Sequence, residues 1–104
     1  MTSRTGDAEK HYELRFKASA KKEWDKLIGP VKQQLHAKLA ERLKNPRVES
    51  AKLHGQDQKD RYKIKLRSSG YRLVYQVYDD IVVVEVIAVG KRERGSVYEN
   101  ARKR

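Results

Sequence analysis

RYKIKLRSSGYRLVY, residues 61–75, alternates charged and apolar side chains and is interrupted once by a serine–serine–glycine sequence. Successive side chains of a strand point to opposite faces of a sheet, so the alternation predicts a strand with Lys63, Lys65 and Arg67 on one face. The interruption is typical of a hairpin turn, and we expect a second, antiparallel strand over residues 71–78. The stretch holds five basic residues, three tyrosines and no acid. Such a face suits a polyanion, although a solvated outer face of a sheet shows the same alternation.

The segments on either side of this stretch predict two more strands and two helices. Residues 11–17 alternate as a strand does, and residues 81–89 are almost continuously apolar and β-branched, as in a strand with both faces largely covered. Ser19 is typical of the N-cap of a first helix, and Pro30 suits the first turn of a second. The apolar stripes of the two helices are Ala20, Trp24, Leu27 and Ile28, and Val31, Leu35, Leu39 and Leu43.

This order of elements predicts a compact α+β domain. We expect a small four-stranded antiparallel sheet, two N-terminal helices packed on one of its faces, and a short C-terminal helical segment. The basic strand would then face away from the two helices, and the C-terminal segment could fold back over it.

Composition points to one domain with an anionic partner. The chain has 104 residues and a formal net charge of +11, far more charge than solubility requires. We expect residues 1–10 to be a disordered leader or an expression remnant and residues 11–104 to form a single domain. The absence of cysteine excludes disulfides and thiol chemistry, and no apolar run is long enough to cross a membrane. These features indicate a cytoplasmic protein.

A second basic group directly follows the last strand, and an isolated tyrosine comes shortly after it: Lys91, Arg92, Arg94 and Tyr98. In a meander of strands, this group can reach the surface that carries Lys63, Lys65 and Arg72. Arginine binds phosphate oxygens bidentately and lysine acts as a point charge, so the combined cluster suits the transition state of phosphodiester cleavage.

The histidines do not belong to these clusters. His11, His36 and His54 lie on the first strand, on a helix and in a loop, so acid–base work falls to lysine, arginine or tyrosine, with reference pKa values of about 10 and above. Such groups exchange protons poorly near neutral pH, and we expect slow action on free RNA and faster action when another body holds the RNA aligned for attack. Glu85 and Glu93 are the nearest carboxylates, and no cluster has the spacing of metal ligands.

Taken together, these segments resemble the RelE toxins of bacterial toxin–antitoxin systems, and the ribosome-dependent branch in particular. The likeness covers about residues 11–104 and is carried by Lys22–Leu27, Asn45–Arg47, Tyr62–Val77, Val89–Arg94 and Tyr98. It implies the four-stranded fold described above. It also implies an endoribonuclease that cuts messenger RNA in the ribosomal A site by attack of the 2′-hydroxyl, which would inhibit translation.

The resemblance implies a set of catalytic residues, all of them present in this chain: Lys63, Lys65, Arg72, Arg92 and Tyr98. By resemblance, Tyr98 and the two lysines align and activate the 2′-hydroxyl, Arg72 stabilises the charged phosphate, and Arg92 assists the leaving 5′-oxygen. The products would be a 2′,3′-cyclic phosphate and a 5′-hydroxyl, and no metal or other cofactor is expected. Further contacts to RNA or the ribosome are expected from Arg61, Arg67, Lys91, Arg94 and His54, the last standing where close relatives often have arginine.

The implied partners are a RelB-like antitoxin, which would mask or displace the basic face, and the 70S ribosome with messenger RNA in its A site. Operator DNA would be bound only through the antitoxin, and no membrane partner is expected. Two other interpretations stay open. A non-catalytic module could use the same cations only to bind RNA or the ribosome, and a ParE-like toxin would share the fold but inhibit DNA gyrase, although that branch lacks the lysine, arginine and tyrosine set.

Overall fold

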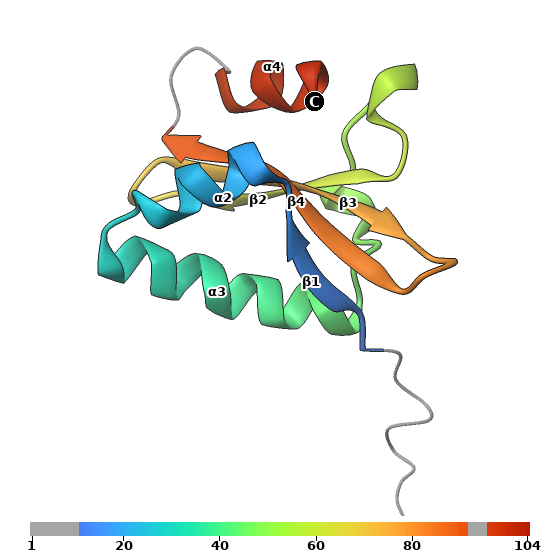
Figure 1. Cartoon of the computed structure of the whole chain (residues 1–104), viewed down its shortest axis with the longest axis horizontal. Coiled ribbons are helices and arrows are strands. Elements are labelled where there is room, and N and C mark those ends of the chain that lie inside the picture. The colour runs from blue at the N-terminus through green and yellow to red at the C-terminus, as the bar shows by residue number, and fades with distance from the viewer. Residues whose placement is uncertain (1–10, 92–95) are drawn as a thin grey trace, which may run out of the picture.

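The computed structural model describes residues 11–91 and 96–104. Residues 1–10, where we expected a leader, lie outside the described residues. No helix in the described part of the chain is long and apolar enough to cross a membrane. The elements follow the expected order (Figure 1): β1 (Glu13–Phe16), α2 (Ala18–Asp25), α3 (Gly29–Lys44), the short 3₁₀ turns η1 (Glu49–Ala51) and η2 (Gln56–Gln58), β2 (Arg61–Leu66), β3 (Tyr71–Tyr78), β4 (Val83–Lys91) and α4 (Ser96–Lys103).

The four strands form one sheet in the order β1-β4-β3-β2. The hairpin partners β2 and β3, and β3 and β4, are antiparallel as expected. β1 instead pairs with β4 in parallel, so the sheet is mixed and the expectation of a purely antiparallel sheet is wrong for this strand. A tight turn forces antiparallel pairing, whereas β1 is joined to the next strand through two helices, and a connection of that length permits either direction.

Helices α2 and α3 cover one face of the sheet and form the larger hydrophobic cluster with it. α2 contributes Ala20 and Trp24 and α3 contributes its expected stripe, and both pack on alternate residues of the strands, among them Tyr62, Ile64, Leu66, Leu73, Tyr75, Val84 and Val86. Because these strand residues recur every second position, their neighbours in sequence point to the opposite face.

The boundary between the two helices differs from the prediction at two positions. α2 begins at Ala18 after Lys17 as N-cap, one residue before the expected cap Ser19, and it ends at Asp25. Ile28 therefore lies at the N-cap of α3 and is 61% exposed, so its assignment to the buried stripe of the first helix is wrong. The spacing rule holds only while the chain stays helical, and the helix ends before Ile28 is reached.

Helix α4 packs on the other face of the sheet, so that the sheet lies between α4 and the long helix α3 (Figure 1). Its buried residues Val97 and Ala101 join a second, smaller cluster with Val74, Ile87 and Ala88. The β3–β4 register shifts by one residue next to Val74, which places an extra residue in β4. Such a bulge leaves backbone groups of the strand without a ladder partner, and other parts of the fold have to satisfy them.

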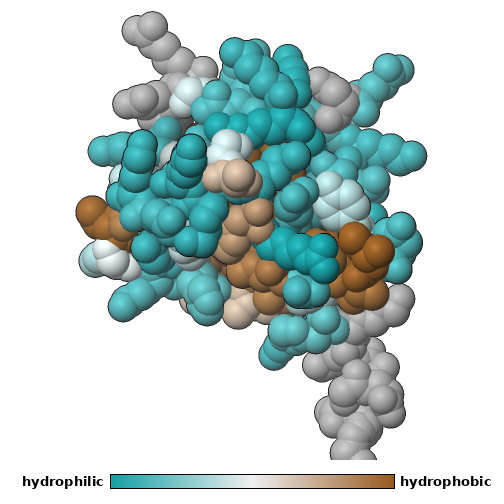
Figure 2. All heavy atoms as spheres, viewed as in Figure 1, coloured by the Kyte–Doolittle hydropathy of each residue, from teal (hydrophilic) through white to brown (hydrophobic). Residues whose placement is uncertain are grey.

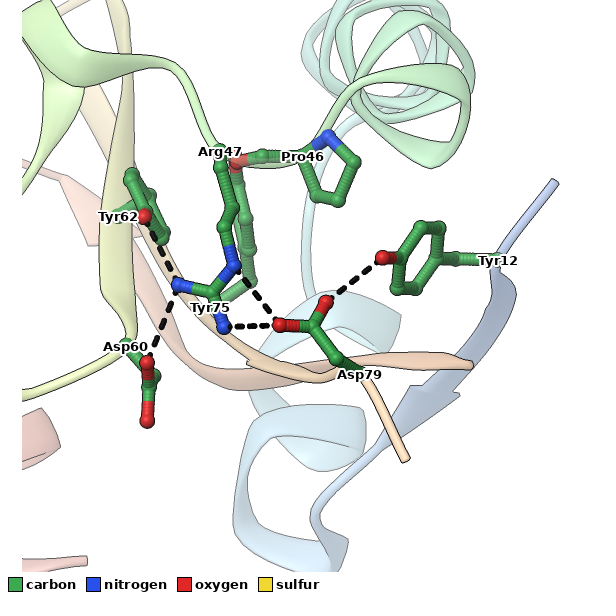
Figure 3. A network of polar contacts seen from close by, with 7 residues as sticks. All are labelled: Tyr12, Pro46, Arg47, Asp60, Tyr62, Tyr75 and Asp79. Carbon is green, nitrogen blue, oxygen red and sulfur yellow. Dashed lines mark hydrogen bonds and ion pairs between the residues drawn. The ribbon is translucent and has the colours of Figure 1, made fainter. Parts of the chain in front are cut away.

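A polar network ties the loop after α3 to the β3–β4 turn and to the start of β1 (Figure 3). Arg47 donates two hydrogen bonds to Asp79, at 3.0 and 2.7 Å, and one to the hydroxyl of Tyr62 at 3.0 Å. It also pairs with Asp60 at 3.1 Å. The Tyr12 hydroxyl donates to the same Asp79 at 2.7 Å, and this hydrogen bond raises the pKa of Tyr12.

The molecular surface is mainly hydrophilic. Charged residues make up 38% of the chain, and hydrophobic side chains show only in separate patches on the face seen in Figure 2. Among the described residues, the large hydrophobic side chains that are strongly exposed are Ile28 and Ile81. In the view of Figure 2 the protein therefore presents charge rather than a broad apolar surface.

Candidate nucleic-acid interface

Lys63, Lys65 and Arg72 lie on the face of the sheet that carries α4. The residues of β2 that alternate with the two lysines pack against α2 and α3, so the lysines point away from those helices. The strand register agrees, because Lys63 stands opposite Val74 of the α4-side cluster and Lys65 stands opposite Arg72. We refer to Lys63, Lys65 and Arg72 as the basic row.

Two hollows lined by cations open beside the basic row. The first has a volume of about 270 Å³ and is lined by Lys65, Leu66, Arg67, Gly70 and Arg72. The second has a volume of about 380 Å³ and is lined by Arg42, Ser50, Ala51, Lys63, Lys65 and Arg67. No acidic residue lines either hollow, and Lys65 and Arg67 line both. A concave surface lined by cations concentrates field lines and attracts anions such as phosphate groups.

Arg42 of α3 binds the backbone of the strand that carries Lys63 and Lys65. Its Nη1 donates to the carbonyl of Lys63 at 3.1 Å and to the hydroxyl of Tyr75 at 2.8 Å. The Tyr75 hydroxyl donates in turn to the carbonyl of Pro46 at 2.6 Å, and burial raises the pKa of Tyr75. The sequence analysis missed Arg42, because nothing in the helical periodicity distinguishes it from the other cations of α3.

Tyr98 lies on α4, which packs over the same face of the sheet as the basic row. It is partly buried and contacts the α4-side cluster. A Cβ atom at Gly90 would lie 3.4 Å from Cγ2 of Val97, so the first turn of α4 packs closely on β4 at this residue. Gly90 stands opposite Arg72 in the β3–β4 register. The first turn of α4, with Tyr98, is thereby brought to the part of the sheet that holds Arg72.

Arg61 has a different environment from the one expected. It is only 8% exposed, its Nε donates to Oε1 of Gln76 at 2.9 Å, and its Nη1 donates to the carbonyl of Ala101 in α4 at 2.5 Å. Its guanidinium is therefore engaged inside the fold, beneath the C-terminal end of α4. Sequence reasoning grouped Arg61 with the RNA contacts, because local alternation cannot show that α4 covers this end of the strand.

The remaining expected binding residues are dispersed. Lys91 is exposed at the end of β4 and stands opposite Tyr71, which packs on the α2–α3 side, so it does not share the face of the basic row. His54 lines a separate hollow of about 510 Å³ in the loop before β2, whereas the cationic hollow with Gly70 lies at the hairpin after β2. Arg92 and Arg94 lie outside the described residues.

A phenol and a carboxylate lie near the β3–β4 turn, at the end of the sheet away from the β2–β3 turn. The Tyr78 hydroxyl donates to Oε1 of Glu85 at 3.0 Å, and burial together with this hydrogen bond raises the pKa of Tyr78. In the described ranges, no group of three or more histidine, aspartate or glutamate side chains could hold a metal ion. The described part of this face offers guanidinium, ammonium and phenol groups, which can bind a phosphodiester, stabilise its developing charge and exchange protons.

Comparison with known proteins gives a consistent result. A family model described as "ParE toxin of type II toxin-antitoxin system, parDE" matches residues 14–95. The "mRNA interferase toxin RelE" of Escherichia coli strain K12 is 60% identical over 93 residues, which cover 89% of this chain and 96% of that protein.

Two crystal structures from Escherichia coli match the fold as well. The isolated RelE toxin is 59% identical with a TM-score of 0.76, covering 88% of this chain and 96% of that one. The toxin chain of the intact RelBE toxin–antitoxin complex is 60% identical with a TM-score of 0.75, covering 80% of this chain and 99% of that one. The family model carries the ParE name, whereas the relatives with about 60% identity are RelE toxins. The chain therefore belongs to the RelE/ParE family of type II toxin–antitoxin toxins, and within that family it is a RelE-type toxin.

Proposed function

We propose that this protein is the toxin of a type II toxin–antitoxin system and acts as a ribosome-dependent endoribonuclease on messenger RNA. The proposal is supported above all by the shared location of the basic row and α4. Lys63, Lys65 and Arg72 lie on the sheet face over which α4 packs with Tyr98. The relative that is 60% identical is named an mRNA interferase.

The proposed reaction is transesterification within the RNA strand. The 2′-hydroxyl of one nucleotide attacks the adjacent phosphorus, the bond to the 5′-oxygen breaks, and the products are a 2′,3′-cyclic phosphate and a 5′-hydroxyl. Tyr98 and the lysines of the basic row align and activate the 2′-hydroxyl, while Arg72 binds the phosphate oxygens as negative charge builds up on them. Arg92 assists the departing 5′-oxygen. One of these groups accepts the proton of the 2′-hydroxyl, and another donates a proton to the departing 5′-oxygen.

The ribosome enters the proposal for a physical reason. Without a histidine in the basic row, proton transfer depends on groups whose reference pKa values lie about 3 units or more above neutral. Alignment of the reacting atoms has to compensate, and a well-oriented reaction gains many orders of magnitude over a random encounter. Messenger RNA held in the A site of the 70S ribosome would supply that alignment.

The proposed inhibitor is a RelB-like antitoxin. A solved RelE relative is described as part of an intact toxin–antitoxin complex. The net charge of +11 makes it favourable for an acidic segment to cover the basic row. Operator DNA would be reached only through the antitoxin.

The proposal is tested by brief induction of the protein in bacterial cells, followed by primer extension on several messages. Wild type is expected to stop growth and to leave breaks at codon-phased positions, only in translated messages. Tyr98→Phe and Arg92→Ala are expected to abolish the breaks and the arrest, whereas Glu99→Gln, an exposed carboxylate neighbouring Tyr98 on α4, should behave as wild type.

Other outcomes would support the competing interpretations. Growth arrest that persists in both variants without message breaks would indicate a non-catalytic RNA- or ribosome-binding module. Arrest accompanied by loss of DNA supercoiling and intact messages would indicate a ParE-like gyrase inhibitor.

A further inference from the structure

The C-terminal end of α4 is attached to α2 through an ion pair. Nη1 and Nη2 of Arg104 donate to Oε1 and Oε2 of Glu23, each at 3.0 Å. The side chains of Arg104 and Glu23 are only 21% and 26% exposed. A bidentate guanidinium–carboxylate pair with this much burial is more specific in geometry than an exposed surface pair.

The same two side chains also bind the backbone of β4. Oε1 of Glu23 accepts a hydrogen bond from the amide of Val89 at 3.1 Å, and Nη1 of Arg104 donates to the carbonyl of Ile87 at 2.9 Å. β1 ends opposite Val86, so beyond that residue this edge of β4 has no strand neighbour. The pair therefore satisfies backbone groups that the bulge and the end of β1 leave outside the ladder.

Arg61 attaches the same end of α4 to β2. It donates to the carbonyl of Ala101 in the last turn of the helix, which also accepts a hydrogen bond from the backbone amide of Arg104 at 3.0 Å. A guanidinium at this end also complements the partial negative charge of the helix C-terminus. Arg61 is held in place by Gln76 and is almost fully buried. Glu23, Arg104 and Arg61, which come from α2, the residue after α4, and β2, are called the helix clamp below.

The helix clamp acts on the helix that carries Tyr98. α4 has 8 residues and two fully buried side chains, Val97 and Ala101, and a helix this short is not stable by itself. Tyr98 and Ala101 are three positions apart and so lie side by side on the helix surface. Fixing the carbonyl of Ala101 and the side chain of Arg104 therefore fixes the position of Tyr98.

We propose that Glu23, Arg104 and Arg61 are positioning residues of the nuclease, which hold α4 so that Tyr98 stays over the basic row. This inference rests on the proposed function. It assigns a role within the fold to Arg61, which the sequence analysis had grouped with the RNA-binding cations. None of the three residues needs to touch the RNA.

The test uses Glu23→Gln, Arg104→Met and Arg61→Met, which disrupt the helix clamp from three different elements. Glu99→Gln and Lys103→Met are matched controls, because they remove the same charges from exposed positions of α4. Two quantities are measured for each purified variant: hydrogen exchange of the α4 amides, and single-turnover cleavage of messenger RNA on ribosomes as a function of toxin concentration. Exchange in β2–β4 shows that each variant is folded.

We expect the clamp variants to lower the saturating cleavage rate without raising the half-saturating toxin concentration. Losing a charge-assisted hydrogen bond shifts a local equilibrium by about tenfold or more, so α4 amides should exchange about tenfold faster and the saturating cleavage rate should fall by a similar factor. Glu23→Gln makes the protein more positive, so its half-saturating concentration should stay the same or fall. A residue needed only for binding would produce the opposite pattern.

Three outcomes would overturn the proposal. In the first, the clamp variants exchange and cleave like their controls. In the second, they exchange faster while the saturating rate is unchanged. In both cases the three residues do not position Tyr98 for catalysis. The third outcome is a wild-type protein with no cleavage on any ribosome. That outcome refutes the proposed function first and the positioning role with it, whereas the first two leave the function intact.

Discussion

Tyr75→Phe removes a single oxygen atom from the centre of the fold. The Tyr75 side chain is completely buried, and its hydroxyl is both donor and acceptor. It donates to the carbonyl of Pro46 at 2.6 Å and accepts from Arg42 at 2.8 Å. Through these bonds it joins the end of α3 to β3, the strand that carries Arg72 of the basic row. The ring of phenylalanine can keep every apolar contact, so the substitution isolates the two hydrogen bonds.

The expected loss of stability follows from those two bonds. Arg42 keeps its hydrogen bond to Lys63, so its loss is small, whereas the buried carbonyl of Pro46 is left without its hydroxyl donor. Together the lost bonds and the unsatisfied carbonyl correspond to about 2–3 kcal/mol of unfolding free energy. For a domain of this size that is a fall in Tm of about 10–15 °C.

The assay is thermal unfolding at pH 7, monitored by circular dichroism or calorimetry. Tyr71→Phe is the matched control, because it makes the same chemical change at the first residue of the same strand, on a side chain that is only partly buried. The control should change Tm by no more than about 3 °C. If Tyr75→Phe lowered Tm no more than the control does, the hydroxyl would not stabilise the joint between α3 and the sheet, and the reasoning would be refuted.

Three further predictions concern the surface network, pH and salt. Arg47→Met removes the bidentate pair of Figure 3, which is more than one-third exposed, so calorimetry should show a modest loss of about 1 kcal/mol. Three tyrosines have raised pKa values in the folded protein: Tyr12, Tyr75 and Tyr78. Their contribution to stability is complete below about pH 10, the pKa of tyrosine in the unfolded chain, and should be lost as pH rises through the higher pKa values of the folded state. A Tm that holds steady well above pH 10 would contradict this. Lys65→Met should weaken binding of a short single-stranded RNA and reduce the slope of log affinity against log salt by about 0.7, as expected for one phosphate contact fewer; an unchanged slope in a binding titration would show that Lys65 contacts no phosphate.

Local patterns predicted the strands and their faces. The alternation in β2 predicted that Lys63 and Lys65 lie on the sheet face away from α2 and α3. The serine–serine–glycine turn correctly predicted that β3 pairs with β2 in antiparallel orientation. Both features are determined by residues close together in sequence, where side-chain alternation and turn chemistry act directly. A short C-terminal helical segment was also expected, and the structure has α4 there.

Apart from the early end of α2, which leaves Ile28 exposed, the misjudged features depend on contacts between distant segments. The parallel pairing of β1 with β4 follows from how two helices return the chain, which periodicity does not encode. The burial of Arg61 beneath α4 and the pairing of Glu23 with Arg104 likewise join residues that are 40 and 81 positions apart. The candidate site is divided in the same way. Its basic row was predicted from local alternation, whereas the groups that fix Tyr98 became visible only in three dimensions.

Cleavage of one defined messenger RNA by the purified protein, compared free in solution and bound to the 70S ribosome, tests the central claim most directly. The account predicts a cut in the A-site codon only when the ribosome is present, with a 2′,3′-cyclic phosphate on one fragment and a 5′-hydroxyl on the other. It also predicts that Tyr98→Phe reduces the cut sharply while binding to the ribosome is kept. Equal cutting of free and ribosome-bound RNA, or full activity in Tyr98→Phe, would contradict it.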